Sequence, residues 1–261
     1  MKIAISGKGG VGKTLLASFL SKIFADSDYS VLAIDADSNA TLAATLGFPN
    51  AGEITPISEM KELIEERTGA TPGKSGTYFR LNPKVDDLPE KFWREHRGIK
   101  LMVMGQLKRG SSGCYCPENA MLQALVSHLL LARNEVIIMD MEAGIEHLGR
   151  ATARAVDVLI IVVEPARRSI ETASKIRQLA GDMGLHNIAV VGNKIRNESE
   201  KEFLTSSLAD FKFLGFIPYE PALVEADIAG VSIIDSSPKV LAAVNDIFKA
   251  LTSGAKIEAK K

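Results

Sequence analysis

The clearest chemistry in this sequence lies in a run of eight residues near its start, Gly7-Lys8-Gly9-Gly10-Val11-Gly12-Lys13-Thr14. The run has the pattern Gly-x-x-x-x-Gly-Lys-Thr of a phosphate-binding loop. Its glycines let the backbone curl so that successive N–H groups point at phosphate oxygens, and a following helix adds its positive dipole end. The run therefore predicts binding of a nucleoside triphosphate.

The residues around this loop supply the context that it needs. Lys2–Ser6 is typical of a short buried strand, and Leu15–Phe24 of a helix with an apolar stripe. In such a loop Lys13 reaches the β- and γ-phosphates, and the Thr14 hydroxyl ligates Mg²⁺. The expected phosphate-binding residues are Gly9, Gly10, Val11, Gly12, Lys13 and Thr14.

Acidic residues follow two further expected strands, at Asp35 and Asp37 and at Asp140. Chemistry in open α/β sheets collects at the carboxyl ends of the strands. We expect Asp140 to hold Mg²⁺ through a water, Asp35 to support the metal's hydration shell and Asp37 to orient the attacking water. Gly144 could offer its N–H to the γ-phosphate. An acid at the end of a strand can instead cap a helix or turn, and that alternative stays open.

The sequence Asn193-Lys194-Ile195-Arg196 ends another expected strand, where P-loop GTPases place Asn-Lys-x-Asp. The aspartate of that motif accepts hydrogen bonds from guanine, whereas Arg196 has no acceptor. Adenine is therefore favoured, with Asn193 and Lys194 near the base. Pro218 and Tyr219 follow the last expected strand and could close over the base. These residues predict that the nucleotide is ATP.

Cys114 and Cys116 are the two cysteines of the chain. Pro117 is favoured at the first position of a helix, which places Cys116 near an N-cap. A helix N-terminus favours the thiolate, the form of cysteine that binds metal. Two chains related by a two-fold axis would supply four thiolates, a set that suits Zn²⁺, Ni²⁺ or an iron–sulfur cluster. The alternative is a pair of ordinary, inert cysteines.

Composition narrows the class of protein. The 261 residues are 46% hydrophobic and 24% charged, as in ordinary globular proteins, and the net charge is −1. This charge gives no electrostatic case for a nucleic-acid or membrane partner. The chain runs directly from Met1 into an expected strand, and no apolar run approaches the ~20 residues that span a bilayer. Two cysteines this close together do not make a secreted scaffold, so we expect a cytoplasmic protein.

Apolar runs alternate with helical patterns along most of the chain. Several runs are continuously apolar, as in strands that are buried on both faces of a parallel sheet. The expected strands after the first are Tyr29–Asp35, Gly98–Met104, Glu135–Asp140, Val156–Val163, Ile188–Asn193 and Phe213–Ile217. The later expected helices are Met121–Arg133, Ser169–Met183, Glu198–Ala209 and Lys239–Leu251. The apolar stripe of Lys239–Leu251 is expected to dock on the sheet.

This pattern predicts the α/β class: a single-domain P-loop NTPase with a mostly parallel central sheet flanked by helices. The domain is expected to span residues 1–253, followed by a polar tail at 254–261. Residues 49–98, rich in charge and proline, are expected to form an insertion between core strands, with a helix over Ile57–Arg67.

The motifs together resemble the MinD/ParA/nitrogenase-iron-protein class, which carries a deviant Walker A loop. The resemblance covers essentially the whole chain. It rests on Lys8, the Asp-x-Asp at 35–37, the Asp-x-x-Ala-Gly at 140–144 and the Asn-Lys at 193–194. It implies an ATP-promoted homodimer in which Lys8 reaches the partner's phosphates, so the expected catalytic residues are Lys8, Lys13 and Asp37. Ser38 departs from the class, because many members have proline at that position.

Two longer stretches, Gly113–Leu122 and Asp140–Thr152, closely resemble one branch of this class. This branch comprises the CooC-type nickel-insertion ATPases, which mature carbon monoxide dehydrogenase, and AcsF-type relatives, which serve acetyl-CoA synthase. The resemblance implies that Cys114 and Cys116 bind Ni²⁺ at the dimer interface, with Zn²⁺ possible at the same thiolates. It also implies that metal promotes the dimer and that Mg-dependent ATP turnover drives delivery to the target enzyme. His147, a lone histidine, is more often structural than a ligand.

Two other functions stay open as alternatives. The first is an ATP-dependent electron carrier with an iron–sulfur cluster, like the nitrogenase iron protein. That family takes its cysteines from two separated segments, whereas here both lie in one Cys-x-Cys. The second is a partition-type ATPase acting on DNA or membrane. It needs a basic patch or a basic terminal helix, and neither is evident.

Overall fold

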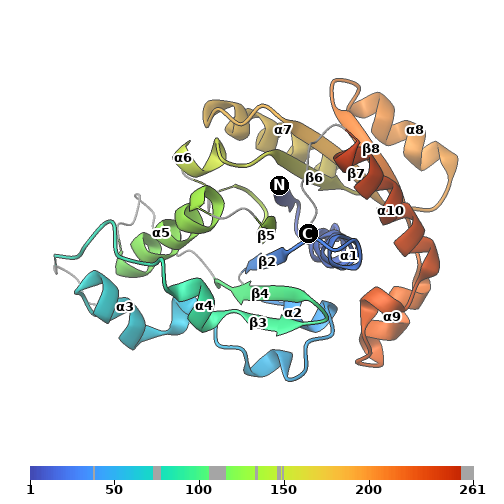
Figure 1. Cartoon of the computed structure of the whole chain (residues 1–261). Coiled ribbons are helices and arrows are strands. Elements are labelled where there is room, and N and C mark those ends of the chain that lie inside the picture. The colour runs from blue at the N-terminus through green and yellow to red at the C-terminus, as the bar shows by residue number, and fades with distance from the viewer. Residues whose placement is uncertain are drawn as a thin grey trace.

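The computed structural model describes residues 1–37, 39–72, 78–105, 116–132, 135–145, 148 and 150–253. These residues contain one eight-stranded sheet in the order β3-β4-β2-β5-β1-β6-β7-β8 (Figure 1). The pairs are parallel except β3 with β4, so the expectation of a mostly parallel sheet is confirmed. The strands are β1 (Lys2–Gly7), β2 (Val31–Ala36), β3 (Arg94–His96), β4 (Ile99–Val103), β5 (Val136–Met141), β6 (Val158–Val163), β7 (Ile188–Ile195) and β8 (Lys212–Pro218).

Helices cover both faces of this sheet, as Figure 1 shows. Apolar side chains of α1 and α10 form a core on one face, and those of α5, α7 and α8 pack into a core on the other. The helices are α1 (Lys13–Asp26), α2 (Leu42–Thr45), α3 (Lys61–Thr68), α4 (Leu88–Phe92), α5 (Pro117–Ala132), α6 (Arg150–Ala153), α7 (Arg167–Asp182), α8 (Glu198–Ser207), α9 (Pro221–Ile228) and α10 (Pro238–Thr252). Short 3-10 turns lie at Ala51–Glu53, Ile57–Glu59 and Ile233–Asp235.

The continuously apolar strands account for the two cores. Side chains alternate between the faces of a strand. In β6, Leu159 and Ile161 therefore pack with the α5 and α7 side, while Ile160 and Val162 pack with the α1 and α10 side. All four are 0% exposed. A strand between two helical layers is buried on both faces, which is why β6 is apolar throughout and lacks the alternation of a half-exposed strand.

The C-terminal helix α10 docks on the sheet, as its apolar stripe predicts. Val240, Val244 and Ile247 are fully buried beside β8 and α1. The helix starts at Pro238, and the Ser237 hydroxyl caps it by accepting a hydrogen bond from the Val240 N–H at 3.2 Å. Among the described residues, no helix is long and apolar enough to cross a membrane.

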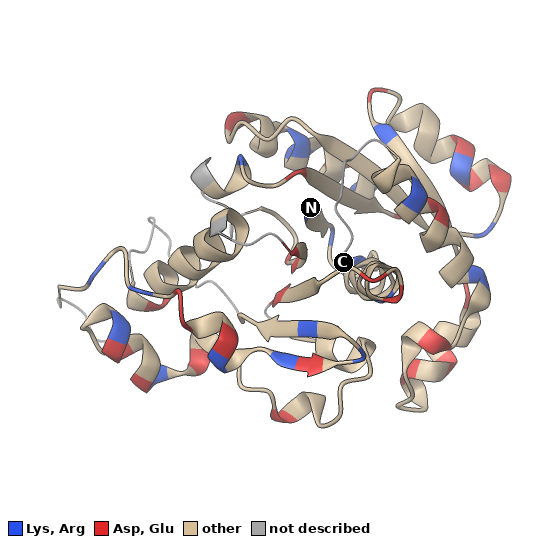
Figure 2. Cartoon of the chain, viewed as in Figure 1, with Lys and Arg blue, Asp and Glu red and all other residues tan. Residues whose placement is uncertain are grey.

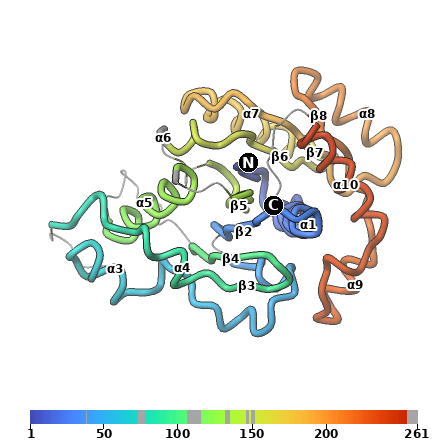
Figure 3. The backbone as a smooth tube through the Cα atoms, in the orientation of Figure 1, coloured from blue at the N-terminus to red at the C-terminus, as the bar shows by residue number. Residues whose placement is uncertain are grey.

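Five short elements were not predicted, namely the helices α2, α4, α6 and α9 and the edge strand β3. The edge strand β3 has only three residues, two of them charged, so it carries no readable hydrophobic period. The helix α9 follows β8 directly, and the Glu220 side chain accepts a hydrogen bond from Ala222 N–H at its start. Figure 3 shows the chain between β2 and β4 at the end of the sheet opposite β8, where α3 contacts α5.

The sheet order brings the sequence motifs to one edge. Strand β1 lies between β5 and β6, and β2 lies beside β5, so the loops after these parallel strands share the carboxyl edge of the sheet. Acidic residues mark the ends of β2 and β5, while both signs of charge are interspersed along the outer helices (Figure 2). The fold therefore gathers the phosphate loop and the acidic loops as the sequence predicts.

Candidate nucleotide-binding site

The phosphate loop connects β1 to α1 in a conformation that requires glycine. Gly7, Gly10 and Gly12 have φ values of 147°, 80° and 96°, in the left-handed region. A Cβ at Gly7 would collide with the Val162 carbonyl oxygen, and one at Gly12 with the Asn193 amide. Among the described residues, no side chain caps the start of α1. Its first N–H groups are therefore available to an anion such as phosphate.

Thr14 and Asp140 form a pair that suits Mg²⁺. The Thr14 hydroxyl donates to Asp140 Oδ2 at 2.6 Å. Asp140 is 1% exposed, and its Oδ1 has no hydrogen-bond partner within the described chain. The pKa of Asp140 is raised to about 7, chiefly by burial and also by the charge of Asp35, against the hydrogen bond from Thr14 and the charge of Lys13. A hydroxyl beside a buried carboxylate with an unused oxygen is a donor set of the kind that Mg²⁺ prefers.

Asp35 and Asp37 both shape the loop after β2. Asp35 is fully buried and pairs in register with Asp140. Its Oδ1 accepts from Asp37 N–H at 3.2 Å and its Oδ2 from Leu42 N–H at 2.9 Å. Burial raises the pKa of Asp35 to about 6, with these two hydrogen bonds opposing the rise. Asp37 is partly exposed, and its Oδ1 accepts from Asn39 N–H at 2.9 Å, so its carboxylate also organises a turn.

Gly144 is held against β1 by a residue that sequence reasoning missed. Its N–H donates to the Ser6 hydroxyl at 3.3 Å, and that hydroxyl donates to the Gly144 carbonyl at 2.7 Å. Ser6 is completely buried next to the phosphate loop. The long N–H contact is the weaker of the two, so the Gly144 N–H could exchange Ser6 for a phosphate oxygen. A polar residue in an otherwise apolar strand was the available signal for Ser6.

Asn193 and Lys194 fasten the end of β7 to the phosphate loop. Asn193 is 2% exposed; its Nδ2 donates to the Val11 carbonyl at 2.7 Å, and its Oδ1 accepts from Lys194 N–H at 2.8 Å. Lys194 Nζ donates to the Gly10 carbonyl at 2.7 Å, from a backbone with a φ of 60°. Both residues thus lie where the sequence motif predicts, and in this structure they support the loop backbone.

Arg196 and Tyr219 lie together beyond this junction. The Arg196 guanidinium lies 4.9 Å from the centre of the Tyr219 ring, and its Nη1 lies 3.6 Å from Glu200 Oε1. Tyr219 N–H donates to the Ile195 carbonyl at 2.9 Å, and 43% of the residue is exposed. Pro218 ends β8 immediately before it. The structure therefore places Pro218 and Tyr219 beside the end of β7, which carries Asn193 and Lys194, and the place of these residues around the base stays a prediction.

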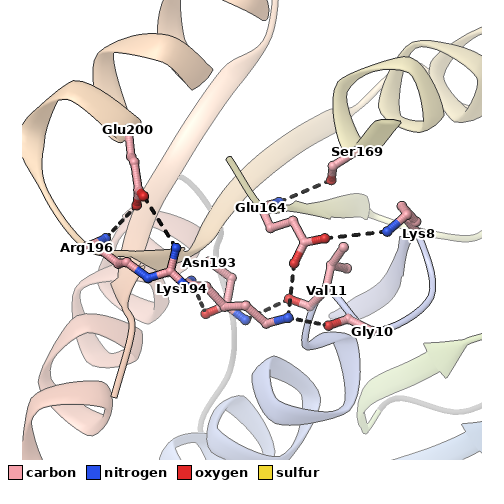
Figure 4. A network of polar contacts seen from close by, with 9 residues as sticks. All are labelled: Lys8, Gly10, Val11, Glu164, Ser169, Asn193, Lys194, Arg196 and Glu200. Carbon is pink, nitrogen blue, oxygen red and sulfur yellow. Dashed lines mark hydrogen bonds and ion pairs between the residues drawn. The ribbon is translucent and has the colours of Figure 1, made fainter. Parts of the chain in front are cut away.

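Lys8 contacts a second residue that sequence reasoning missed. Its Nζ lies 3.5 Å from Glu164 Oε1, and Lys194 Nζ lies 3.0 Å from Glu164 Oε2. Figure 4 shows the two lysines approaching this carboxylate from two sides. Glu164 follows β6, the strand next to β1. An acid at the carboxyl end of a strand beside the phosphate loop was the signal that could have identified it.

The cysteine pair lies partly outside the described residues, which include Cys116 but neither Cys114 nor His147. Cys116 directly precedes α5, and its carbonyl accepts from Ala120 N–H at 3.1 Å. Pro117 is the first helical residue, so the predicted N-cap position of Cys116 is confirmed. Within the described residues, no three histidine, cysteine or acidic side chains are grouped to bind a metal.

Comparison with protein families assigns the fold. Residues 2–233 match the CobQ/CobB/MinD/ParA nucleotide-binding domain family. A chain of the MinC:MinD cell division protein complex of Aquifex aeolicus superposes with a TM-score of 0.69 at 25% identity, covering 99% of this chain and 98% of that one. The match spans most of the sequence and contains the phosphate loop. The chain therefore belongs to the CobQ/CobB/MinD/ParA family of nucleotide-binding proteins, and it is an ATPase of this P-loop class.

Individual relatives indicate which branch of this family the chain resembles. The carbon monoxide dehydrogenase accessory protein CooC of Rhodospirillum rubrum is 46% identical over 240 residues, covering 91% of each chain. An uncharacterized ATP-binding protein of Methanocaldococcus jannaschii is also 46% identical, over 236 residues, covering 89% of this chain and 91% of that one. The resemblance to the CooC branch is thus confirmed, and the electron-carrier and partition alternatives are not favoured.

Proposed function

We propose that this protein is a dimeric metallochaperone ATPase of the cytoplasm, with nickel as its cargo and carbon monoxide dehydrogenase or acetyl-CoA synthase as its target. The observation that carries the proposal is the 46% identity to CooC over 91% of each chain. The cysteine pair supports it, because Cys116 lies at the start of α5. A thiolate there is stabilised by the helix dipole and is a soft ligand that suits nickel or zinc.

In the proposed ATPase cycle each loop has a separate task. The backbone from Gly9 to Thr14 holds the phosphates, and Lys13 neutralises their charge. Thr14 and Asp140 would hold Mg²⁺, which would stabilise the negative charge of the phosphates. Because Asp140 has a pKa of about 7, bound Mg²⁺ would favour its carboxylate over its protonated form.

Three further residues act on the γ-phosphate or on the attacking water. Asp37 orients the water, Gly144 offers its N–H to the γ-phosphate, and Lys8 reaches from the partner protomer to stabilise the transition-state charge. Asp35 supports the loop that carries Asp37, as its two backbone hydrogen bonds indicate. The adenine base would lie near Asn193 and Tyr219.

In this proposal the metal and the nucleotide both shift the equilibrium between monomer and dimer. Each chain brings two thiolates, from Cys114 and Cys116, so a four-sulfur site exists only in the dimer. A ligand that binds the dimer but not the monomer promotes dimerisation. ATP does the same through Lys8, so nucleotide turnover would couple dimer opening to release of nickel. Residues 49–98, which would be an insertion in the ATPase domain of residues 1–253, have no assigned part in this cycle.

Substitution of Asp37 should separate nucleotide binding from turnover. Asp37→Ala is expected to lower ATP hydrolysis by about 100-fold, at the lower end of the range for loss of a positioned base, while ATP affinity changes less than threefold. The matched variant Asp37→Asn can still accept from Asn39 N–H and keep the turn. It should be equally inactive, because its amide lacks the carboxylate charge that orients the water. Steady-state phosphate release and equilibrium ATP binding measure both effects. Full activity of Asp37→Asn would instead make Asp37 a structural turn residue.

Delivery to a target enzyme tests the function itself. Nickel-free carbon monoxide dehydrogenase or acetyl-CoA synthase, mixed with nickel-loaded protein and ATP, should gain activity at least tenfold faster than with the same free nickel. The Asp37→Ala variant should lose this gain because it cannot complete turnover. Running both targets side by side identifies which one is served. Equal activation by wild type and by Asp37→Ala would remove ATP hydrolysis from the delivery step.

A further inference from the structure

Glu164 is fixed beside the phosphate loop by its position in the sheet. Strand β6 pairs with β1 so that Val162 lies opposite Gly7, and Glu164 comes two residues later. Its backbone N–H donates to the Ser169 hydroxyl at 3.1 Å, and Ser169 is 1% exposed at the start of α7. The Glu164 side chain is 20% exposed. Its carboxylate is therefore built into the site and does not belong to a free surface.

This one carboxylate bridges two lysines of the nucleotide site. Oε2 binds Lys194 Nζ at 3.0 Å, and Oε1 lies 3.5 Å from Lys8 Nζ. Burial alone would raise the pKa of Glu164, but the hydrogen bond and charge of Lys194, followed by the charge of Lys8, lower it. Glu164 is thus ionised at neutral pH. Figure 4 shows the resulting chain of contacts from Lys8 through Glu164 to Lys194 and Gly10.

Hydrogen bonds hold Lys194 more firmly than they hold Lys8. Lys194 also donates to the Gly10 carbonyl at 2.7 Å, so it has two short contacts. Lys8 makes one long contact, to Glu164, within the part of the chain that the structure describes, and its side chain is 37% exposed. Partly exposed ion pairs of this length are weak. Lys8 can therefore leave Glu164 more easily than Lys194 can.

We propose that Glu164 is a positioning residue that keeps Lys8 in its own protomer until the partner's triphosphate takes the lysine, while Lys194 stays on the phosphate loop. This inference rests on the proposed reach of Lys8 across the dimer. A triphosphate with Mg²⁺ attracts the ammonium more strongly than a single partly solvated carboxylate does. The Glu164 contact therefore opposes dimerisation in both protomers, so the dimer forms only when a bound triphosphate draws Lys8 away from Glu164.

Glu164→Gln tests the restraint, because glutamine keeps an oxygen that can accept from Lys194 but loses the charge that attracts Lys8. With a nonhydrolysable ATP analogue, we expect its dimer dissociation constant to fall about fivefold relative to wild type, since two weak pairs no longer compete. Affinity of the monomer for the analogue should change less than twofold. Sedimentation velocity and fluorescence titration measure these two quantities. The matched control is Glu171→Gln on α7, which removes the same charge from an exposed position and should behave as wild type.

A second measurement follows the contact without relying on dimers. Acylation of Lys8 in nucleotide-free protein, quantified by peptide mass spectrometry, should be severalfold faster in Glu164→Gln, because the Lys8 amine is no longer held against the Glu164 carboxylate. If Glu164→Gln changed neither the dimer dissociation constant nor the rate of Lys8 acylation, the proposed restraint would be wrong. A dimer that weakens in step with nucleotide affinity would show that Glu164 only supports the loop, and would overturn it as well.

The Lys8→Ala variant distinguishes failure of this inference from failure of the proposed function. If Lys8 acts in trans, Lys8→Ala binds the analogue within a few-fold of wild type but stays monomeric and loses hydrolysis. Normal dimerisation of Lys8→Ala would remove the trans role and the restraint with it. Suppose instead that Lys8→Ala stays monomeric, while Glu164→Gln matches wild type in both dimerisation and Lys8 acylation. The restraint by Glu164 would then be wrong, and the trans role of Lys8 would stand.

Discussion

Replacing Lys13 with alanine is expected to lower ATP affinity by about 100-fold or more. Lys13 is 6% exposed within the phosphate loop and is the cation expected at the β- and γ-phosphates. Hydrogen bonds to charged groups contribute about 1.5–3 kcal/mol each, and two of them correspond to a factor of at least 100. Equilibrium binding of a fluorescent ATP analogue measures the loss.

A second lysine of the same helix provides the control for this variant. Lys22 pairs with Asp26 at 3.0 Å and lies two turns away from the loop on α1. Lys22→Ala should bind ATP within twofold of wild type, because it changes the charge of α1 without touching the phosphate site. Lys13→Ala that retained ATP affinity within a few-fold would mean that the loop does not bind triphosphate as we infer.

Replacing either cysteine with serine is expected to abolish tight nickel binding. Either Cys114→Ser or Cys116→Ser leaves a dimer with two thiolates and two weakly coordinating hydroxyls. Structural four-ligand zinc sites contribute roughly 10–16 kcal/mol, so losing two ligands of four corresponds to an affinity loss of at least about 1,000-fold. Competition with a chromogenic nickel chelator measures this change. Thiolate ligation releases protons, so the affinity of the wild type should fall as the pH is lowered.

The matched control is His128→Asn, on the helix α5 that Cys116 directly precedes. It removes a common metal ligand from α5 and should leave nickel affinity unchanged. Nucleotide binding should also stay intact in both serine variants, because the phosphate loop belongs to β1 and α1. If His128→Asn lost nickel while Cys116→Ser kept it, the metal would have to lie elsewhere.

Much of the fold could be predicted because its strands are buried on both faces. Continuous apolar runs such as Val158–Val163 are long, bounded by polar residues and hard to place anywhere except in a covered parallel sheet. The phosphate loop adds a fixed strand–loop–helix order. By contrast, β3 lies at the sheet edge, where three mostly polar residues pair through their backbones and leave no side-chain period.

The sequence predicted which loops form the site, but it predicted fewer of the contacts between their side chains. Asp140 and Thr14 could be placed together because each ends or begins an element at the same sheet edge. The bridging role of Glu164 depends on β6 lying next to β1, which follows from the sheet order and not from local sequence. The bond from Asn193 to Val11 joins residues 182 positions apart, so only the folded chain reveals it.

The central claim is that two chains share one nickel ion, and native mass spectrometry of the nickel-saturated protein tests it most directly. Spectra with and without a nonhydrolysable ATP analogue report the mass of each assembly and the number of ions it holds. We expect one nickel ion per dimer, half an equivalent per chain, with the analogue raising the dimer fraction and leaving this ratio unchanged. One tightly held ion on each monomer, retained in Cys116→Ser, would contradict the account.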